Sequence, residues 1–214
     1  LAHISGDQAL IAAFNSGEDI HTATAAQVFG VAQDQVTPDM RRAAKAVNFG
    51  IVYGISPFSL SQDIHVTVAQ AKAYMDKYFA HYAGVRAYMD RVVEQGRADG
   101  YVSTLYGRRW LPELKSSNFN TRAFGERVAL NMPIQGSAAD IIKLAMLRVD
   151  DALRQAGLAA RLVLQVHDEL IVECPEGEAE QVKELLKTEM ESVAQLSVPL
   201  IADAKAGRTW AEAH

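Results

Sequence analysis

The spacing of apolar and polar residues follows a helical period over most of the first two thirds of the chain. The best-marked helix begins at Thr37-Pro38-Asp39, an N-cap followed by a first-turn proline and an acid, and is expected to end before Gly54. Thr67 and Gln70 form a capping-box pattern that opens another helix. Because proline interrupts a helix, a break is predicted at Pro133. Helices are predicted at residues 7–14, 18–29, 38–52, from 67 onward, 83–98, 120–131, 135–156 and 176–195.

Strand-like alternation is confined to shorter stretches. Residues 101–112 alternate like a short hairpin with Gly107 in its turn. Residues 161–173 are two β-rich runs that flank His167-Asp168-Glu169, and a final strand is expected at 198–204. The first two thirds are therefore mainly helical and the end is mixed. We predict a helix-rich α+β fold, with a helical layer joined to part of a small antiparallel sheet.

The stretch RRAAKAVNFGIVYG, residues 41–54, carries an unusual stripe. Arg41, Lys45, Phe49 and Tyr53 are four residues apart, and such a step turns a helix by about 400°, so the stripe drifts only ~40° per step. Cations near a helix N-terminus favour anions, and aromatic faces can stack on a sugar or a base. A nucleoside triphosphate along this helix would place its phosphates at Lys45 and its base near Tyr53. The alternative is that the aromatics enter the core while the two cations extend to the surface.

The second candidate site is QVHDE, residues 165–169. Charged residues between β-branched and leucine runs fit poorly inside a packed sheet, so a tight turn is expected to carry Asp168 and Glu169 at a sheet end. Carboxylates there suit hard divalent cations, although consecutive strand residues face opposite ways and only one is expected to be a direct ligand. The alternative is an ordinary solvated hairpin turn. One carboxylate is too few for catalytic Mg²⁺, so a second must come from elsewhere.

Charge and composition refine this picture. The net charge of the 214 residues is −5, but residues 38–148 hold 15 Lys/Arg and 9 Asp/Glu, a net of +6, which leaves −11 for the rest. Such charge asymmetry indicates that an otherwise acidic protein has one basic surface that binds polyanions. The alternative is chance clustering of charged residues. The sequence contains no apolar run of membrane-spanning length and no signal-peptide pattern. The single cysteine, Cys174, excludes an internal disulfide and a cysteine zinc cluster, so a reducing, cytoplasmic setting is expected.

Taken together, the motifs resemble those of family A DNA polymerases, the bacterial DNA polymerase I type. RRAAKAVNFGIVYG fits the family pattern Arg-x3-Lys-x3-Phe-x3-Tyr-Gly, and QVHDE is similar to the catalytic hairpin of the family's palm domain. DIHTATAAQVFG at residues 19–30 and ERVALNMPIQGSAADIIK at 126–143 resemble two further family segments. The likeness covers essentially the whole chain, including TWAEAH at its end. All four motifs in order are far more specific than any one alone.

The resemblance implies the fingers, residues 1–121, and the C-terminal part of the palm, residues 122–214, of a right-hand polymerase. The implied reaction is template-directed DNA synthesis in replication and repair, in which a primer 3′-hydroxyl attacks the α-phosphate of a dNTP with the help of two Mg²⁺ ions. The implied partners are primer–template DNA and dNTP, with no membrane. The implied location is the bacterial cytoplasm, in association with the nucleoid.

Residue roles follow from the same resemblance. Asp168 is implied as a catalytic metal ligand, with Glu169 in support. Lys45 is implied to neutralise the triphosphate and to act in catalysis, while Arg41 and His21 bind the outer phosphates. Phe49 is implied to pack on the sugar; phenylalanine at this position, in place of tyrosine, is the family variant that discriminates against dideoxynucleotides. Tyr53 is implied to occupy the templating position. The residues implied to contact the primer–template are Arg127, Asn131, Gln135 and His167.

Two of these assignments have local alternatives. His21 could be a buried, hydrogen-bonded histidine, and Asn131 could cap the break at Pro133. Arg127 and Gln135 are eight apart across that break, so helical spacing alone does not establish a shared face. Tyr106, Arg108 and Arg109 in the first hairpin are interpreted as a solvated turn.

The sequence departs from the family pattern at its beginning. In the family, the segment resembling LAHISGD follows one that supplies the first metal-binding aspartate and a glutamate that excludes ribonucleotides; this sequence starts after it, at Leu1. We therefore expect the isolated chain not to extend primers, and we expect surface exposed by truncation to favour self-association. The main alternative function is a non-catalytic nucleic-acid- or nucleotide-binding module. An unrelated α/β domain would require all four motifs to be coincidental.

Overall fold

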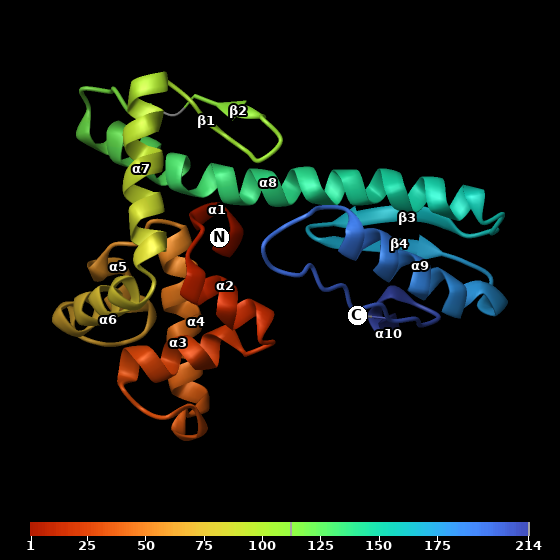
Figure 1. Ribbon diagram of the computed structural model, residues 1–214, viewed down its shortest axis with the longest axis horizontal. Helices are drawn as coiled ribbons and strands as arrows, with labels where there is room; N and C mark the ends of the chain where they lie inside the picture. The colour runs from red at the N-terminus through yellow and green to blue at the C-terminus, as the bar shows by residue number, and fades with distance from the viewer. Residues whose placement is uncertain (112, 214) are drawn as a thin grey trace. The chain divides into compact units, whose positions relative to one another are not determined.

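Helices dominate the computed structural model, which describes residues 1–111 and 113–213 (Figure 1). The chain forms two units, Leu1–Ile134 and Gln135–His214. Unit 1 contains α1 (Ala2–Ser5), α2 (Gln8–Asn15), α3 (Ile20–Phe29), the 3-10 helix η1 (Gln33–Gln35), α4 (Pro38–Val52), α5 (Pro57–Asp63), α6 (Val68–His81), α7 (Ala83–Asp99), β1 (Val102–Ser103) and β2 (Arg109–Trp110). Helix α8 (Phe119–Gln155) begins in unit 1 and ends in unit 2. Unit 2 contains β3 (Arg161–Val166), β4 (Glu169–Glu173), the 3-10 helix η2 (Glu176–Glu178), α9 (Ala179–Ser192) and α10 (Trp210–Ala213).

The capping signals in the sequence correspond to hydrogen bonds at the helix ends. The Thr37 hydroxyl accepts the backbone N–H three residues further on at 3.2 Å, which starts α4. At the start of α6, the Gln70 N–H donates to the Thr67 hydroxyl at 3.2 Å and the Thr67 N–H donates to the Gln70 side chain at 3.0 Å. Gly100 ends α7 with a φ of 80°, a conformation that glycine adopts without strain. These predicted helix starts and ends are confirmed.

The core of unit 1 fixes which side of α4 faces outward. Val28 of α3 and Val47 and Ile51 of α4 are fully buried, and the two helices pack against each other. Tyr78 and Tyr82 lie in the same unit with ring centroids 4.8 Å apart, each at most 2% exposed. Burial of one such side chain stabilises the fold by roughly 1.5–3 kcal/mol. Because the side of α4 that carries Val47 and Ile51 is buried, its other side faces the solvent.

The first predicted hairpin is present in unit 1. Strand β1 pairs with β2 in an antiparallel arrangement, and Gly107 occupies the turn with a φ of 80°. Val102 of β1 packs with Leu114 and with Ala129 of α8 in a small buried cluster. Tyr106 is 47% exposed, as the prediction of a solvated turn requires.

Unit 2 is built on the second hairpin. Strands β3 and β4 pair in an antiparallel arrangement (Figure 1). Val149 and Leu153 of α8 and Val182 of α9 form one buried cluster, against which Leu170 and Val172 of β4 pack. Since Leu170 and Val172 are two apart and share a face, both helices cover the same side of the sheet. The predicted helix-rich α+β fold is confirmed.

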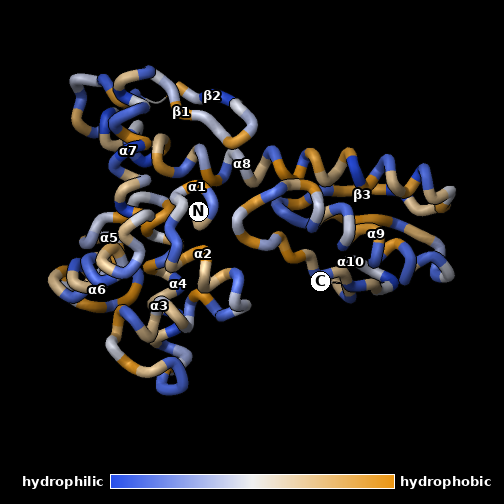
Figure 2. The backbone as a smooth tube through the Cα atoms, in the orientation of Figure 1, coloured by the Kyte–Doolittle hydropathy of each residue, from blue (hydrophilic) through white to orange (hydrophobic). Residues whose placement is uncertain are grey.

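The predicted break at Pro133 is wrong, because residues 120–131 and 135–156 are joined in the single helix α8 with Pro133 inside it. An interior proline costs roughly 3 kcal/mol and one backbone hydrogen bond. Hydrophobic and hydrophilic residues alternate along α8 (Figure 2). Ala129 before the proline and Val149 and Leu153 after it lie in buried clusters, so tertiary contacts on both sides outweigh that local cost. Within residues 1–111 and 113–213, no helix combines the length and hydrophobicity of a bilayer span.

The strand predicted at residues 198–204 is also wrong, since this segment has no regular secondary structure. Pro199 has no N–H to give to a strand ladder. The Ala202 N–H donates to the Glu191 carboxylate at 3.0 Å, so a side chain takes the place of a neighbouring strand. An apolar run becomes a strand only when another strand is available to pair with it.

Candidate functional site

The predicted stripe on α4 lies at the surface. Phe49 is 49% exposed and Tyr53, the residue that ends the helix, is 46% exposed, while Arg41 and Lys45 are also exposed. The alternative that the aromatics enter the core is therefore wrong. Two large exposed aromatics beside two cations form a surface that can meet a ligand that is anionic in one part and flat in another.

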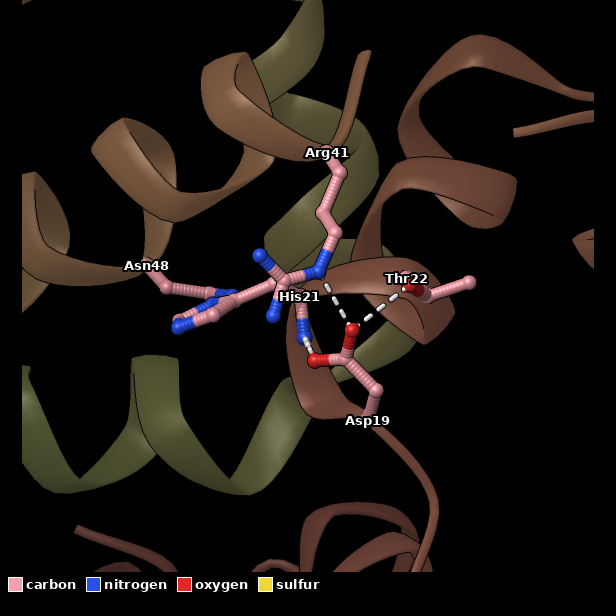
Figure 3. A network of polar contacts seen from close by, with 5 residues as sticks. All are labelled: Asp19, His21, Thr22, Arg41 and Asn48. Atoms are coloured by element: carbon pink, nitrogen blue, oxygen red, sulfur yellow. Dashed lines mark hydrogen bonds and ion pairs between the residues drawn. The ribbon is translucent and has the colours of Figure 1, made fainter. Parts of the chain in front are cut away.

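Asp19 organises the cationic end of this surface (Figure 3). Its carboxylate caps the N-terminus of α3 by accepting the His21 N–H at 3.1 Å, and it accepts the Thr22 hydroxyl at 2.8 Å. The Arg41 guanidinium donates to the same carboxylate at 2.5 Å. This hydrogen bond holds the pKa of Asp19 well below its usual range and raises the pKa of Arg41. The ion pair between Asp19 and Arg41 connects the first turn of α3 to the N-terminal end of α4.

His21 extends from α3 toward the middle of the stripe. Its ring centroid lies 5.9 Å from that of Phe49, and the Lys45 ammonium lies 5.8 Å from the Phe49 centroid. Burial lowers the pKa of His21, and the nearby Arg41 and Lys45 charges lower it further against the opposing effect of Asp19. The structure thus brings four of the predicted nucleotide-contacting residues together, with an imidazole of lowered pKa among two cations and an aromatic ring.

Asn48 is a polar contact of this site that the sequence analysis missed. Its amide nitrogen lies 3.0 Å from His21 Nδ1, and its amide oxygen accepts the Thr24 hydroxyl at 3.1 Å. The available signal was a polar side chain next to the aromatic stripe, on the side of α4 that also carries the buried Val47 and Ile51. Such a residue usually has a specific partner.

An open pocket of about 500 Å³ adjoins the aromatic end of the stripe. Its lining includes Phe49, Tyr53, Asp63 and Arg127. Gly54 has a φ of 67°, and a β-carbon there would lie 3.1 Å from Leu130 and 3.4 Å from the Arg127 side chain. The glycine therefore allows the end of α4 to approach α8 closely, which brings Arg127 and Tyr53 to the same pocket.

Asn131 and Gln135 lie further along α8. Since the helix continues through Pro133, Asn131 is an interior residue and caps no helix end. The alternative role that the sequence allowed for Asn131 is wrong, and its predicted contact with the primer–template stays a prediction. Gln135 is exposed at the start of unit 2.

The second candidate site occupies the tip of the β3–β4 hairpin. Val166 pairs with Glu169, so His167 and Asp168 form a two-residue turn and both are exposed. His167 has a φ of 52°, as the first position of such a turn requires, and its carbonyl accepts the Gln165 side-chain amide. An exposed carboxylate at a tight turn is chemically suited to a hard divalent cation. Across the described parts of the chain, no group of three or more His, Cys, Asp or Glu residues is placed to hold a metal ion.

Comparison with known families assigns the chain. The model of the family described as DNA polymerase family A matches residues 1–212. The chain belongs to DNA polymerase family A. Its similarity to individual family A members extends over the whole length of the sequence, as the resemblance of its motifs predicted.

Among these family A relatives, DNA polymerase I of Streptococcus pneumoniae serotype 4 is 54% identical over 215 residues, and that of Geobacillus stearothermophilus is 52% identical over 214 residues. Each match covers 100% of this chain and 24% of the relative, so the chain spans about a quarter of the length of these polymerases. The structure resembles the POL domain of Pol1 from M. smegmatis, solved in complex with DNA primer-template and dNTP, with a TM-score of 0.94 and 49% identity over 99% of this chain and 38% of that one. The fold is that of part of a polymerase domain.

Proposed function

We propose that this chain is the nucleotide-binding portion of a DNA-directed DNA polymerase, with fingers at residues 1–121 and the C-terminal part of the palm at 122–214. The observation that carries the proposal is the exposed stripe on α4, in which two cations are followed by two aromatics. The solved relative that binds primer-template DNA and dNTP supports the same reading. The reaction is nucleotidyl transfer from a dNTP to a primer 3′-hydroxyl.

The residues of unit 1 bind and orient the nucleotide. Lys45 and Arg41 neutralise the triphosphate, and His21 adds a hydrogen bond to it. Phe49 packs on the sugar, and Tyr53 occupies the templating position beside the pocket that it shares with Arg127. In phosphoryl transfer, positioning and charge neutralisation supply most of the catalysis, so these contacts are expected to affect rate as well as affinity.

Four residues are assigned to the primer–template: Arg127, Asn131, Gln135 and His167. Minor-groove acceptors are shared by all base pairs, so polar side chains there can test the geometry of a pair without reading its sequence.

Asp168 holds Mg²⁺ in this proposal, and Glu169 supports it from the adjacent strand position. The exposed carboxylate of Asp168 fits the oxygen ligands that Mg²⁺ prefers. When bound, Mg²⁺ activates an attacking hydroxyl and neutralises phosphate charge. Two-ion chemistry needs carboxylates beyond this turn, so we propose that the 214-residue chain alone does not extend a primer. Templated extension by the purified chain would refute that part of the proposal.

A chimera tests the function directly. The corresponding quarter of Geobacillus stearothermophilus DNA polymerase I is replaced by this chain, and primer extension is measured. We expect activity within about tenfold of the parent enzyme. Asp168→Asn in the chimera should reduce turnover by at least ~10³, as expected for loss of several kcal/mol of transition-state stabilisation. The exposed Asp151 on α8 provides a matched control, since Asp151→Asn should leave turnover unchanged.

The alternative of a non-catalytic nucleotide-binding module makes the opposite prediction. It expects a folded chimera that binds dNTP and DNA but extends no primer, whatever residue occupies position 168. Near-normal turnover of Asp168→Asn would instead remove the metal role of this carboxylate.

The surface of unit 2 also supports self-association. Val163 and Leu164 on β3 are 50% and 45% exposed, although both are apolar. Exposed apolar strand residues favour pairing with another chain. We propose weak self-association through β3, which a monodisperse monomer in light scattering at high concentration would contradict.

A further inference from the structure

Asn48 connects the buried side of α4 to the candidate nucleotide site. Its amide spans two partners on α3: the oxygen accepts the Thr24 hydroxyl at 3.1 Å, and the nitrogen lies 3.0 Å from His21 Nδ1 (Figure 3 draws Asn48 and His21). Thr24 is fully buried and His21 is half-buried, so this contact links the interior of unit 1 to its surface.

The direction of the Asn48 amide follows from the Thr24 hydroxyl behind it. The Thr24 hydroxyl donates its proton to the Asn48 oxygen at 3.1 Å. The Asn48 nitrogen is left to face His21 Nδ1 at 3.0 Å. Thr24, Asn48 and His21 therefore form a sequence in which each donates to the next.

This order determines where the His21 proton lies. An amide nitrogen can only donate, so His21 Nδ1 must accept. In a neutral imidazole only one nitrogen carries hydrogen, and it must then be Nε2. We propose that Asn48 is a positioning residue that holds His21 as the Nε2–H tautomer, so that the ring presents a neutral hydrogen-bond donor to the phosphates of a bound nucleotide.

The charges around His21 explain why a neutral donor suits this position. Arg41 and Lys45 on α4 already supply two cations, and Asp19 on α3 is paired with Arg41. A third cation between the two would be repelled in the free protein, and burial lowers the pKa of His21 in the same direction. A neutral ring with its proton on Nδ1 would instead turn a lone pair toward phosphate oxygen. Only the tautomer set by Asn48 adds a favourable contact without adding charge.

Ring ¹⁵N NMR of the histidine-labelled 214-residue chain tests the tautomer without any ligand. The signals of His21 are identified by their loss in His21→Gln. We expect an unprotonated Nδ1 and a protonated Nε2, which resonate in well-separated regions. Asn48→Asp preserves the shape but can only accept, so it should move the proton to Nδ1 and raise the pKa of His21. The exposed Asn120 at the start of α8 is the matched control, and Asn120→Asp should leave the His21 spectrum unchanged.

A second pair of variants keeps the test valid if Asn48→Asp folds poorly. Thr24→Ser retains the hydroxyl and should retain the tautomer, whereas Thr24→Val removes it and frees the amide of Asn48 to turn. Thr24→Val is therefore expected to give a mixture of the two His21 tautomers. An Nδ1–H ring in the wild-type chain, or identical spectra for the serine and valine variants, would overturn the proposal.

The phosphate contact rests on the proposed function and is tested separately with Mg²⁺–dATP. Binding should shift the His21 Nε2–H resonance, and Asn48→Asp should weaken binding by about tenfold or more, as expected for loss of one hydrogen bond to a charged group. An Nε2–H tautomer that does not respond to dATP would overturn the positioning role. That result would locate the failure in the nucleotide site and not in the Asn48–His21 contact.

Discussion

Replacing Lys45 by alanine tests whether the cationic part of the α4 stripe binds triphosphate. The Lys45 ammonium is exposed and lies 5.8 Å from the Phe49 centroid, so its environment is between bulk water and a protein interior. Two unit charges 4 Å apart attract by about 1 kcal/mol in water and about 4 kcal/mol at an effective dielectric constant of 20. Exposed pairs fall near the lower end, so we expect a loss of about 1–2 kcal/mol, or a Kd for Mg²⁺–dATP raised by about 5- to 30-fold.

The assay is isothermal titration of the 214-residue chain with Mg²⁺–dATP at two salt concentrations. Arg42→Ala is the matched control, because Arg42 is on the same helix but 79% exposed and paired with Asp39 outside the stripe. It should change Kd less than about twofold. The Lys45 effect should shrink at physiological salt, where the Debye length is about 8 Å. Equal losses for the two variants would indicate non-specific attraction of anions and refute the assignment of Lys45.

Three further predictions concern the elements that hold the site. Arg41 lowers the pKa of Asp19, so the ionised Asp19 carboxylate contributes its full stabilisation at pH values above the ordinary aspartate pKa and loses it only at lower pH. In Arg41→Ala, the midpoint of the Asp19 carboxyl titration followed by NMR should rise. An unchanged midpoint would contradict the ion pair. Leu153 is 1% exposed in the core of unit 2, so Leu153→Ala should lower the free energy of unfolding by about 2–5 kcal/mol, measured by urea denaturation. Val163→Ala, at a half-exposed position, is the control and should lower it by less than ~1 kcal/mol. Gly54→Ala places a side chain at a φ of 67° and should cost about 1–2 kcal/mol, so a thermal midpoint equal to that of wild type would show that the close approach of α4 to α8 is not required.

Local chemistry was the most predictable part of the fold. The start of α4 at Thr37 and the reciprocal bonds of Thr67 and Gln70 depend on residues within one turn, so the sequence alone was enough to place them. The turn at His167-Asp168 was predictable for the same reason, because charged residues interrupt two apolar runs.

Features decided by distant packing were less predictable. The cost of Pro133 is local and visible in the sequence, but the contacts that outweigh it come from other elements. The apolar residues 198–204 have strand-like composition without a pairing strand. Spacing also left open whether Phe49 faces the core or the solvent; its 49% exposure settles this, and Asn48 became visible only when α3 was placed beside α4.

The most direct test is a map of where a nucleotide binds. The ¹⁵N-labelled chain is titrated with Mg²⁺–dATP, and shifts of backbone and side-chain resonances are followed by NMR. We expect the largest saturable shifts at His21, Arg41, Lys45 and Phe49, with little change at Arg42 or on α9. Saturable shifts confined to surfaces away from α3 and α4 would contradict the claim that the exposed side of α4 holds the incoming nucleotide.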